Sequence, residues 1–481
     1  MVNYLCFKTK KKRREYRNML QLFRDTKEML QDRTFLKKAV TIALPVAMQG
    51  MLNTIVNLVD TLMIGTLGET AVAAVGLANK VFFVFSLLVF GVVSGSGVLA
   101  AQYWGNRDLK NIRKVLGTAL MIAGLGSLFF VVPSIARPEL VMRIFTTSEN
   151  AIALGATYLP IAAVSYPFIA ITNVYVAMMR SVGRVKAPVA TSCMAILINI
   201  LLNYTLIFGK FGMPALGVAG AAAATLAARV AESAVMLLVV YLTRTPLACR
   251  IREMFGFSRA FLHQFVSTCA PVIANEFMWG LGTTVYSMAY GRMGDDAVAA
   301  ITIATTIQDI VVVLFQGLSA ATAVILGHEM GAGRLKQAER YARQFFILSA
   351  LTTLAAMGIC YGIRWHVIGL YRITPQVARA VNLCLLVFIL YMPFKNFNFI
   401  NIVGVLRSGG DTKVCLIIDT SGVWAIGIPM AFLGGLILHQ PIYIVYAMVL
   451  SEEFYKAVVG YIRYRQKRWL RNLAVELGGE G

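Results

Sequence analysis

Long apolar runs separated by short polar connections recur along the whole chain. A run of about 20 apolar residues crosses the ~30 Å hydrocarbon layer of a bilayer as a helix. The pattern therefore predicts an all-α integral membrane protein with twelve transmembrane helices, because helices satisfy their backbone hydrogen bonds internally. The expected spans lie near residues 39–65, 71–100, 113–136, 151–179, 187–209, 215–242, 262–290, 297–326, 341–363, 378–405, 414–438 and 442–462.

One short sequence occurs twice at the ends of expected spans. GTLGETAVAA at residues 65–74 matches GRMGDDAVAA at residues 291–300 in six of ten positions, 226 residues later. An even number of spans, six, separates the copies, so both have the same orientation and the repeat is parallel, about an axis along the membrane normal. We expect two six-helix lobes with a cleft between them. Further pairs at this spacing are Pro45 and Pro271, Gly91 and Gly317, Gly105 and Gly331, and, one residue further apart, Arg180 and Arg407.

The repeat and the connections divide the chain into five parts. The long connection between the sixth and seventh spans is the natural lobe boundary. The expected parts are a basic N-terminal arm at 1–38, an N-terminal lobe at 39–243, a connection at 244–261, a C-terminal lobe at 262–463 and a C-terminal tail at 464–481.

Composition supports a membrane protein, and the position of charge orients it. Of the 481 residues, 58% are hydrophobic and 14% are charged, against about 25% charged residues in soluble domains. The net charge is +22, but the arm, the tail and the connections after even-numbered spans hold 34 Lys or Arg, against seven in the opposite connections. This positive-inside pattern places both termini in the cytosol and argues against nucleic-acid binding. The seven Cys and four His show no spacing typical of disulfides or metal sites.

Asp60 ends a polar stripe in the first expected span. Asn57, Asn53 and Gln49 precede it by three, seven and eleven residues, which places all four on one face of a helix. An ionisable residue inside a span is costly and indicates a partner or a water-filled cavity. We expect Asp60 and Asn57 to belong to a coupling site, with Gln49 and Asn53 facing a substrate cleft.

The fifth expected span contributes Asn199 and Asn203, one helical turn apart and at a depth comparable with that of Asp60. A carboxylate with amide neighbours accepts a proton or coordinates Na+, whose ligands are hard oxygens. The alternative is a buried, hydrogen-bonded Asp60 that only fixes helix packing. Pro45 removes a backbone donor fifteen residues before Asp60 and permits a bend there.

Glu276 and Lys395 are expected at similar depths near the membrane midplane, since the seventh and tenth spans run in opposite directions. We expect them to form an ion pair in the C-terminal lobe that a cation or a charged substrate displaces; the alternative is a static packing pair. Arg229 and Glu232, three residues apart, are expected to pair on their own helix.

The second and eighth spans are expected to border the cleft. Asp309 and Lys80 lie at similar depths in these spans, so we expect Asp309 to contact a cationic substrate or to meet Lys80, with a locally solvated Asp as the alternative. Met278 belongs to a group of methionines in the central spans, a residue type suited to promiscuous binding surfaces.

Several motifs resemble the multidrug and toxic compound extrusion (MATE) family over residues 39–463. They occur in the family's order and twice: PVAMQ, NLVDTLMIG, NYTLIFGKFGMP and ALGVAGAAAAT, then PVIANE, GLSAATAVILGHEMGAG and VGVLRSGGDTK. The resemblance implies a V-shaped MATE-type fold, a bacterial cell membrane and efflux of organic compounds driven by inward H+ or Na+. It implies no cofactor besides that ion, and we expect a monomer that contacts membrane lipids.

The resemblance also implies roles for single residues. Asp60 matches the cation or proton site of the N-terminal lobe, with Asn199, Asn203 and, more weakly, Thr225 as neighbours; relatives have Asp where this chain has Asn203. In the C-terminal lobe, Glu276 and Asn396 match residues that hold the cation in part of the family.

Two functional classes follow. The favoured one is a secondary active antiporter that exports amphipathic or cationic compounds by alternating access. The alternative within the same superfamily is a flippase for a lipid-linked substrate, which for an anionic headgroup needs several Lys or Arg in the cleft. No catalytic motif of an intramembrane enzyme occurs in the sequence, so no enzymatic activity is expected.

Overall fold

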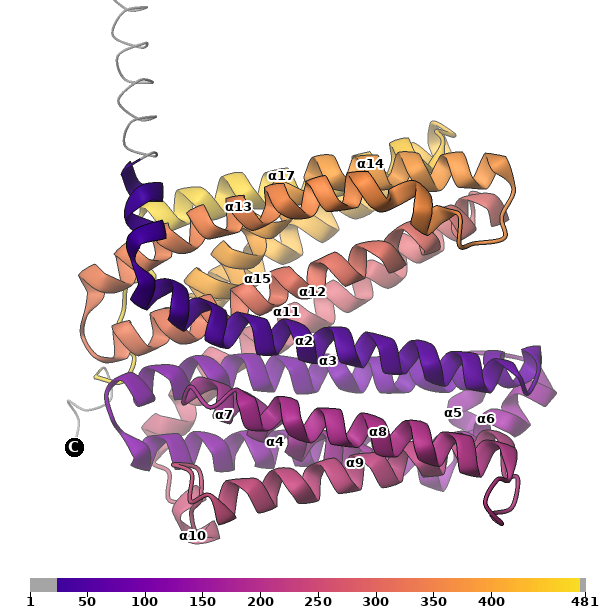
Figure 1. The fold of residues 1–481 in the computed structure, drawn as a ribbon, viewed down its shortest axis with the longest axis horizontal. Helices are drawn as coiled ribbons and strands as arrows, with labels where there is room; N and C mark the ends of the chain where they lie inside the picture. The colour runs from indigo at the N-terminus through magenta and orange to yellow at the C-terminus, as the bar shows by residue number, and fades with distance from the viewer. Residues whose placement is uncertain (1–23, 476–481) are drawn as a thin grey trace, which may run out of the picture.

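The computed structural model describes residues 24–475, which form an elongated bundle of helices (Figure 1). Within this range the chain contains no β-strand. The all-α fold is therefore confirmed. Most of the predicted N-terminal arm and the last six residues of the predicted tail lie outside the described residues.

Two sets of helices follow one another along the chain. The N-terminal half contains α2 (Arg33–Gly65), α3 (Glu69–Gly105), α4 (Leu109–Ala136), α5 (Pro138–Arg143), α6 (Glu149–Val164), α7 (Tyr166–Ser181), α8 (Lys186–Phe208) and α9 (Gly217–Leu242). After the short α10 (Ile251–Met254), the C-terminal half contains α11 (Arg259–Gly291), α12 (Asp295–Gly331), α13 (Leu335–Ile368), α14 (Pro375–Asn398), η1 (Phe399–Leu406), α15 (Thr412–Ser421), η2 (Gly422–Gly427), α16 (Ile428–Phe432), η3 (Leu433–Ile437) and α17 (Ile442–Arg465).

The two halves lie side by side and diverge toward one end of the molecule (Figure 1). We call the end where α2 begins and α17 ends the base, and the opposite end the far end. Helix α2 packs against α12, and α3 packs against both α11 and α12. These four helices therefore form the seam between the halves.

The repeated sequence forms the same turn in both halves at the far end. Gly68, between α2 and α3, has φ 107°, and Gly294, between α11 and α12, has φ 104°. A backbone with positive φ strongly favours glycine, because a Cβ atom would clash with the chain. The repeat in the sequence thus records a repeated backbone geometry.

Several helices begin before the apolar run that predicts them. Asp32 caps α2 by accepting a hydrogen bond from the Phe35 backbone N–H at 3.0 Å, and α11 starts at the Ser258 cap, whose hydroxyl accepts from the Phe261 N–H at 3.2 Å. Side-chain caps satisfy backbone donors where no apolar signal exists. Helix boundaries therefore extend beyond the hydrophobic pattern.

The number of spans is only partly supported by helix length and apolarity. Among the described residues, nine helices are long and apolar enough to cross a membrane, or ten with α6 and α7 as one bent span. Helices α11 and α17 are not among them; α17 carries Glu452, Glu453 and Lys456 in its centre. Twelve spans remain a prediction.

The fourth expected span is broken rather than continuous. Helices α6 and α7 meet at Ser165 with a bend of 42°. Pro167 follows the break, and a proline has no N–H to continue the helical ladder and clashes with the carbonyl four residues before it. The proline accounts for the difference from the uninterrupted span that hydropathy predicts.

Glycines related by the repeat line the seam between the halves. A Cβ atom on Gly91 would lie 2.6 Å from the Cα of Ile273 in α11, and one on Gly317 would lie 2.6 Å from the Ala43 carbonyl oxygen in α2. At the base, a Cβ atom on Gly331 would lie 1.9 Å from the carbonyl oxygen of Gln102. Small residues thus let the helices of the two halves approach closely.

We predict that Gly331→Ala destabilises the protein, because the added methyl group overlaps the α3 backbone. Overpacking of this kind costs about 1–3 kcal/mol, more than the gain of about 0.5–1 kcal/mol from replacing glycine with alanine in a helix. Gly124→Ala is the matched control, since a Cβ atom there meets nothing within 4 Å. Thermal unfolding in detergent micelles measures both; equal melting temperatures for the two variants would contradict the prediction.

Candidate functional site

Asp60 and the two asparagines of α8 meet inside the N-terminal half. The Asn203 amide nitrogen donates to Asp60 Oδ1 at 2.6 Å and to Asn199 Oδ1 at 3.2 Å. Both asparagines are buried and Asp60 is half-buried, less than two helical turns from the far end of α2. The contacts expected for these three residues are confirmed, while their role in coupling remains a prediction.

This cluster has an unused acceptor. Asn203 Oδ1 is buried and has no hydrogen-bond partner, and a buried polar atom without a partner is costly. A proton carried by Asp60, or a cation lying between the carboxylate and the amide oxygens, would supply the missing partner. The guanidinium of Arg229 in α9 also acts on Asp60 electrostatically, and the Asp60 carboxylate acts on the Tyr158 hydroxyl in α6.

A second polar chain connects α2, α8 and α9. The Gln49 amide donates to Ser192 Oγ at 2.9 Å, and the Ser192 hydroxyl donates to Glu232 Oε1 at 2.9 Å. Arg229 pairs with Glu232 at 2.8 Å, which confirms the pair expected on one helix. Ser192 was not predicted as a site residue, because nothing in its own sequence context indicates a partner on another helix.

The other predicted site residues of the N-terminal half make fewer contacts. Asn53 and Asn57 are exposed and Thr225 is half-buried, and none of the three side chains makes a hydrogen bond to another described residue. Pro45 lies inside the continuous helix α2, where its ring leaves the Thr41 carbonyl without its helical donor.

The expected pair of Glu276 and Lys395 is wrong. Glu276 Oε1 instead accepts a hydrogen bond from Arg407 Nη2 at 3.0 Å, and Lys395 Nζ lies 3.6 Å from Glu453 Oε1 in α17. A similar depth in the membrane did not make Glu276 and Lys395 partners. The side of the helix on which each residue lies decided which charge it meets. Helix α14 packs against α17, and Lys395 is on that side.

Asn396 is also separated from Glu276. Its amide nitrogen donates to the Ser349 carbonyl oxygen at 3.1 Å and to Thr353 Oγ1 at 2.7 Å, both in α13. The structure therefore does not bring Asn396 to the side chain that the family resemblance assigns as its neighbour. Met278 is half-buried, and its carbonyl oxygen accepts a hydrogen bond from Trp424 Nε1 at 3.1 Å.

A buried charge cluster, absent from the sequence-based site, lies in the C-terminal half. Lys456 Nζ lies 3.2 Å from Glu452 Oε1, and the Tyr286 hydroxyl donates to Glu452 Oε2 at 2.6 Å. Asn398 donates to Glu453 Oε2 at 2.8 Å. Glu452 and Lys456 are four residues apart on one helix, a spacing typical of such pairs; the other contacts join helices that are distant in sequence.

Asp309 and Lys80 do not meet. Both are exposed, and no ion pair links either of them to another described residue. Asp309 instead acts electrostatically on Lys395 in its own half. The expected contact between Asp309 and Lys80 is therefore not formed in this structure.

Two contacts related by the repeat close the base. Gln102 at the end of α3 donates to the Ser408 carbonyl oxygen at 2.7 Å, and His328 Nε2 at the end of α12 binds the Ser181 carbonyl oxygen at 2.6 Å. His328 lies 226 residues after Gln102, and Ser408 lies 227 residues after Ser181. In each half, the end of the equivalent helix, α3 or α12, thus binds a backbone carbonyl oxygen of the other half.

Arg407 adds a third link across the seam. Besides Glu276, it binds Ser94 Oγ in α3 at 3.1 Å, and it is almost fully buried.

Among the described residues, no group of three His, Cys, Asp or Glu side chains is arranged to hold a metal ion.

We predict that the new ion-pair partners are energetically coupled and that the expected ones are not. Lys395→Ala and Glu453→Gln should be non-additive by about 0.5–3 kcal/mol, because each removes the same interaction. Lys395→Ala and Glu276→Gln, the matched pair, should be additive. Thermal unfolding of single and double variants in micelles measures both cycles, and coupling in the second cycle only would disprove this assignment.

Comparison with known proteins places the chain in a family. The MatE family model matches residues 45–205 and 271–433, so its two matches begin at the repeat-related Pro45 and Pro271. The multidrug resistance protein PmpM of Pseudomonas aeruginosa is 26% identical, with 85% of each chain covered. The uncharacterized transporter YisQ of Bacillus subtilis is 24% identical over 92% of this chain and 96% of its own.

Solved structures agree on the fold. A crystal structure of a MATE protein in complex with MaL6 has a TM-score of 0.82 at 20% identity and covers 90% of this chain and 96% of its own. A MOP superfamily transporter from Pyrococcus furiosus has a TM-score of 0.81 at 19% identity, with 90% and 95% covered. The chain belongs to the MatE family of multidrug and toxic compound extrusion transporters.

Proposed function

We propose that the chain exports amphipathic or cationic organic compounds across the membrane in exchange for inward H+ or Na+. Family membership and curated relatives that are named multidrug resistance proteins support export. The observation that carries the coupling proposal is the Asp60 cluster, a carboxylate with two buried amides inside the N-terminal half. A flippase for an anionic lipid-linked substrate gains no support from these relatives.

Ion binding would change the contacts between α2 and α8. A protonated Asp60 becomes a hydrogen-bond donor, and Asn203 Oδ1, on the amide group that already contacts Asp60, is an unused acceptor. The Asn203 amide nitrogen would then lose its charged acceptor. A bound Na+ would draw the same oxygens together. Either event would change the packing of α2 against α8.

Helix α2 also transmits such a change to the other half. It packs against α8 on one side and against α12 on the other, so a shift of α2 reaches the seam directly. Coupled exchange requires that the ion bind one arrangement of the halves more tightly than the other. We propose that ion binding favours the arrangement that releases the exported compound.

The base is proposed to face the cytosol. Its connections and termini carry most of the Lys and Arg residues of the chain, as the positive-inside rule expects. Export would then start with separation of the halves at the base, which breaks the Gln102 and His328 contacts. We further propose a monomer in a bacterial cell membrane, with no enzymatic activity and no cofactor besides the coupling ion.

We predict that Asp60→Asn lowers gradient-driven export about tenfold or more, since allosteric coupling of 1–3 kcal/mol corresponds to roughly 5- to 150-fold. Dye export from proteoliposomes, with pH and Na+ gradients imposed separately, measures the loss and identifies the ion. Asp296→Asn in the exposed far-end turn is the matched control. Full export by Asp60→Asn under both gradients would refute the coupling role.

A further inference from the structure

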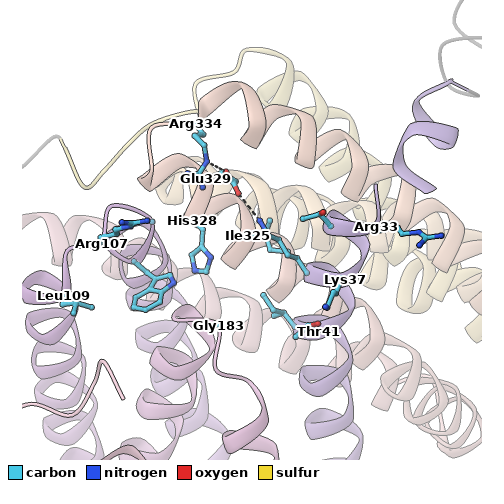
Figure 2. A pocket seen from close by; sticks show the side chains of 15 residues that line it. Arg33, Lys37, Thr41, Arg107, Leu109, Gly183, Ile325, His328, Glu329 and Arg334 are labelled. Atoms are coloured by element: carbon cyan, nitrogen blue, oxygen red, sulfur yellow. Dashed lines mark hydrogen bonds and ion pairs between the residues drawn. The ribbon is translucent and has the colours of Figure 1, made fainter. Parts of the chain in front are cut away.

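A cavity of about 1030 Å³ lies at the base, on the seam between the halves (Figure 2). We call it the basal pocket. Its wall combines the first turns of α2, the turn between α3 and α4, Gly183 and the end of α12. Both halves therefore contribute to one cavity, and its shape depends on the closed base.

The basal pocket carries an excess of positive charge. Its wall holds five Lys or Arg residues and a single acid, Glu329. Glu329 is buried and already paired, with Arg334 at 2.6 Å and with Lys38 at 3.6 Å. The other three cations are Arg33, Lys37 and Arg107, and none of them forms an ion pair with a described residue.

Two of the unpaired cations approach the cavity from different elements. In Figure 2, Lys37 and Thr41 extend from α2 on one side and Arg107 extends from the α3–α4 turn on the other, with His328 between them, whereas Arg33 points away. Trp104 also lines the wall, and its indole N–H has no partner among the described residues. The wall of the pocket thus carries two cations, on opposite sides, and an uncharged donor, none of which is paired with another described residue.

We propose that the basal pocket binds a phosphate-bearing anion, either the headgroup of an acidic phospholipid or a soluble phosphate compound. Phosphate oxygens form strong hydrogen bonds with Lys and Arg, and negatively charged headgroups are attracted to basic segments at the membrane surface. Because the wall includes α12 as well as α2 and α3, the ligand stabilises the closed base. This proposal is independent of the coupling ion and of the exported compound.

Binding of short-chain phospholipids to the purified protein in micelles tests the proposal. The probes are dihexanoyl phosphatidylglycerol, dihexanoyl phosphatidylcholine and inorganic phosphate, and the readout is the rise in melting temperature with ligand concentration. Lys37→Ala with Arg107→Ala should weaken anion binding about tenfold or more. Arg292→Ala with Arg372→Ala, two exposed cations outside the basal pocket, is the matched control.

Each outcome decides the question. Stabilisation by phosphatidylglycerol alone, lost in the pocket variant, supports a lipid ligand, and stabilisation by inorganic phosphate with the same dependence supports a soluble one. Stabilisation that is equal in both double variants, or equal for phosphatidylcholine, would overturn the proposal. If the double variant fails to fold, Lys37→Gln alone serves in its place.

A separate observation concerns residues 469–475, after the end of α17. Leu473 is buried: its N–H donates to Gln102 Oε1 in α3 at 2.7 Å, and its carbonyl oxygen accepts from Gln264 in α11 at 2.9 Å. Trp469 is fully buried and stacks on Tyr464. This short segment therefore joins the core of the C-terminal half to the ends of α3 and α11.

We infer that residues 469–475 act as a strap that holds the base closed. Leu473 packs with the apolar core of the N-terminal half, whereas Trp469 packs with that of the C-terminal half. Asn472 adds a hydrogen bond to the Gly331 carbonyl oxygen at 3.1 Å. The halves cannot separate at the base without releasing one end of this segment.

The reactivity of Cys269 reports on such a separation. Cys269 is buried in α11, and a Cβ atom on Gly95 of α3 would lie 2.8 Å from its sulfur. In a chain that keeps only this cysteine, truncation after Arg468 should speed its labelling by a thiol reagent roughly tenfold, through loss of the Leu473 hydrogen bonds. Truncation after Val475 is the matched control.

Equal labelling rates in the two truncations would overturn the strap. If the shorter chain does not fold, Leu473→Pro replaces it, because proline lacks the N–H that Gln102 accepts. Val475→Pro, at an exposed position of the same segment, is then the control. Faster labelling in Leu473→Pro alone supports the proposal.

Discussion

The structure depends on one constraint: a charged side chain buried inside a lipid-embedded bundle is costly unless it finds a partner within the protein. Asp60 meets it through Asn203, Glu276 through Arg407, and Glu453 through Lys395 and Asn398. Each of these contacts joins two different helices. The few ionisable groups in the spans therefore specify how the helices sit against one another, and a group that changes its charge changes that packing.

The internal repeat gives the two halves equivalent helices and turns, but the polar side chains inside the two halves differ. The far-end turns at Gly68 and Gly294 and the contacts of Gln102 and His328 at the base recur in both halves. The residue that corresponds to Asp60 is Tyr286, which binds Glu452, and the one that corresponds to Glu276 is Gly50. The halves share the far-end turns and the contacts at the base, while each has its own polar interior.

Closure of the base and the proposed coupling site lie at opposite ends of one helix. Helix α2 begins beside the basal pocket and carries Asp60 near its other end, and it packs along α12 of the other half. Contacts at the seam are close because glycines remove the side chains that would separate the helices. Helix α2 therefore connects the base to the Asp60 cluster and packs against the other half between them.

The sequence by itself determined the all-α membrane class, the repeat and the polar stripe that ends at Asp60, because apolar runs, helical periodicity and spacing are local properties of the chain. Asn199 and Asn203 were expected beside Asp60 from their depth and from the family resemblance. It did not determine which partner each charge takes: Glu276 and Lys395 share a depth yet bind Arg407 and Glu453. It also did not predict the break between α6 and α7, Ser192, or the insertion of residues 469–475 between the halves. Those features follow from which helix faces meet, and only the packed tertiary structure decides that.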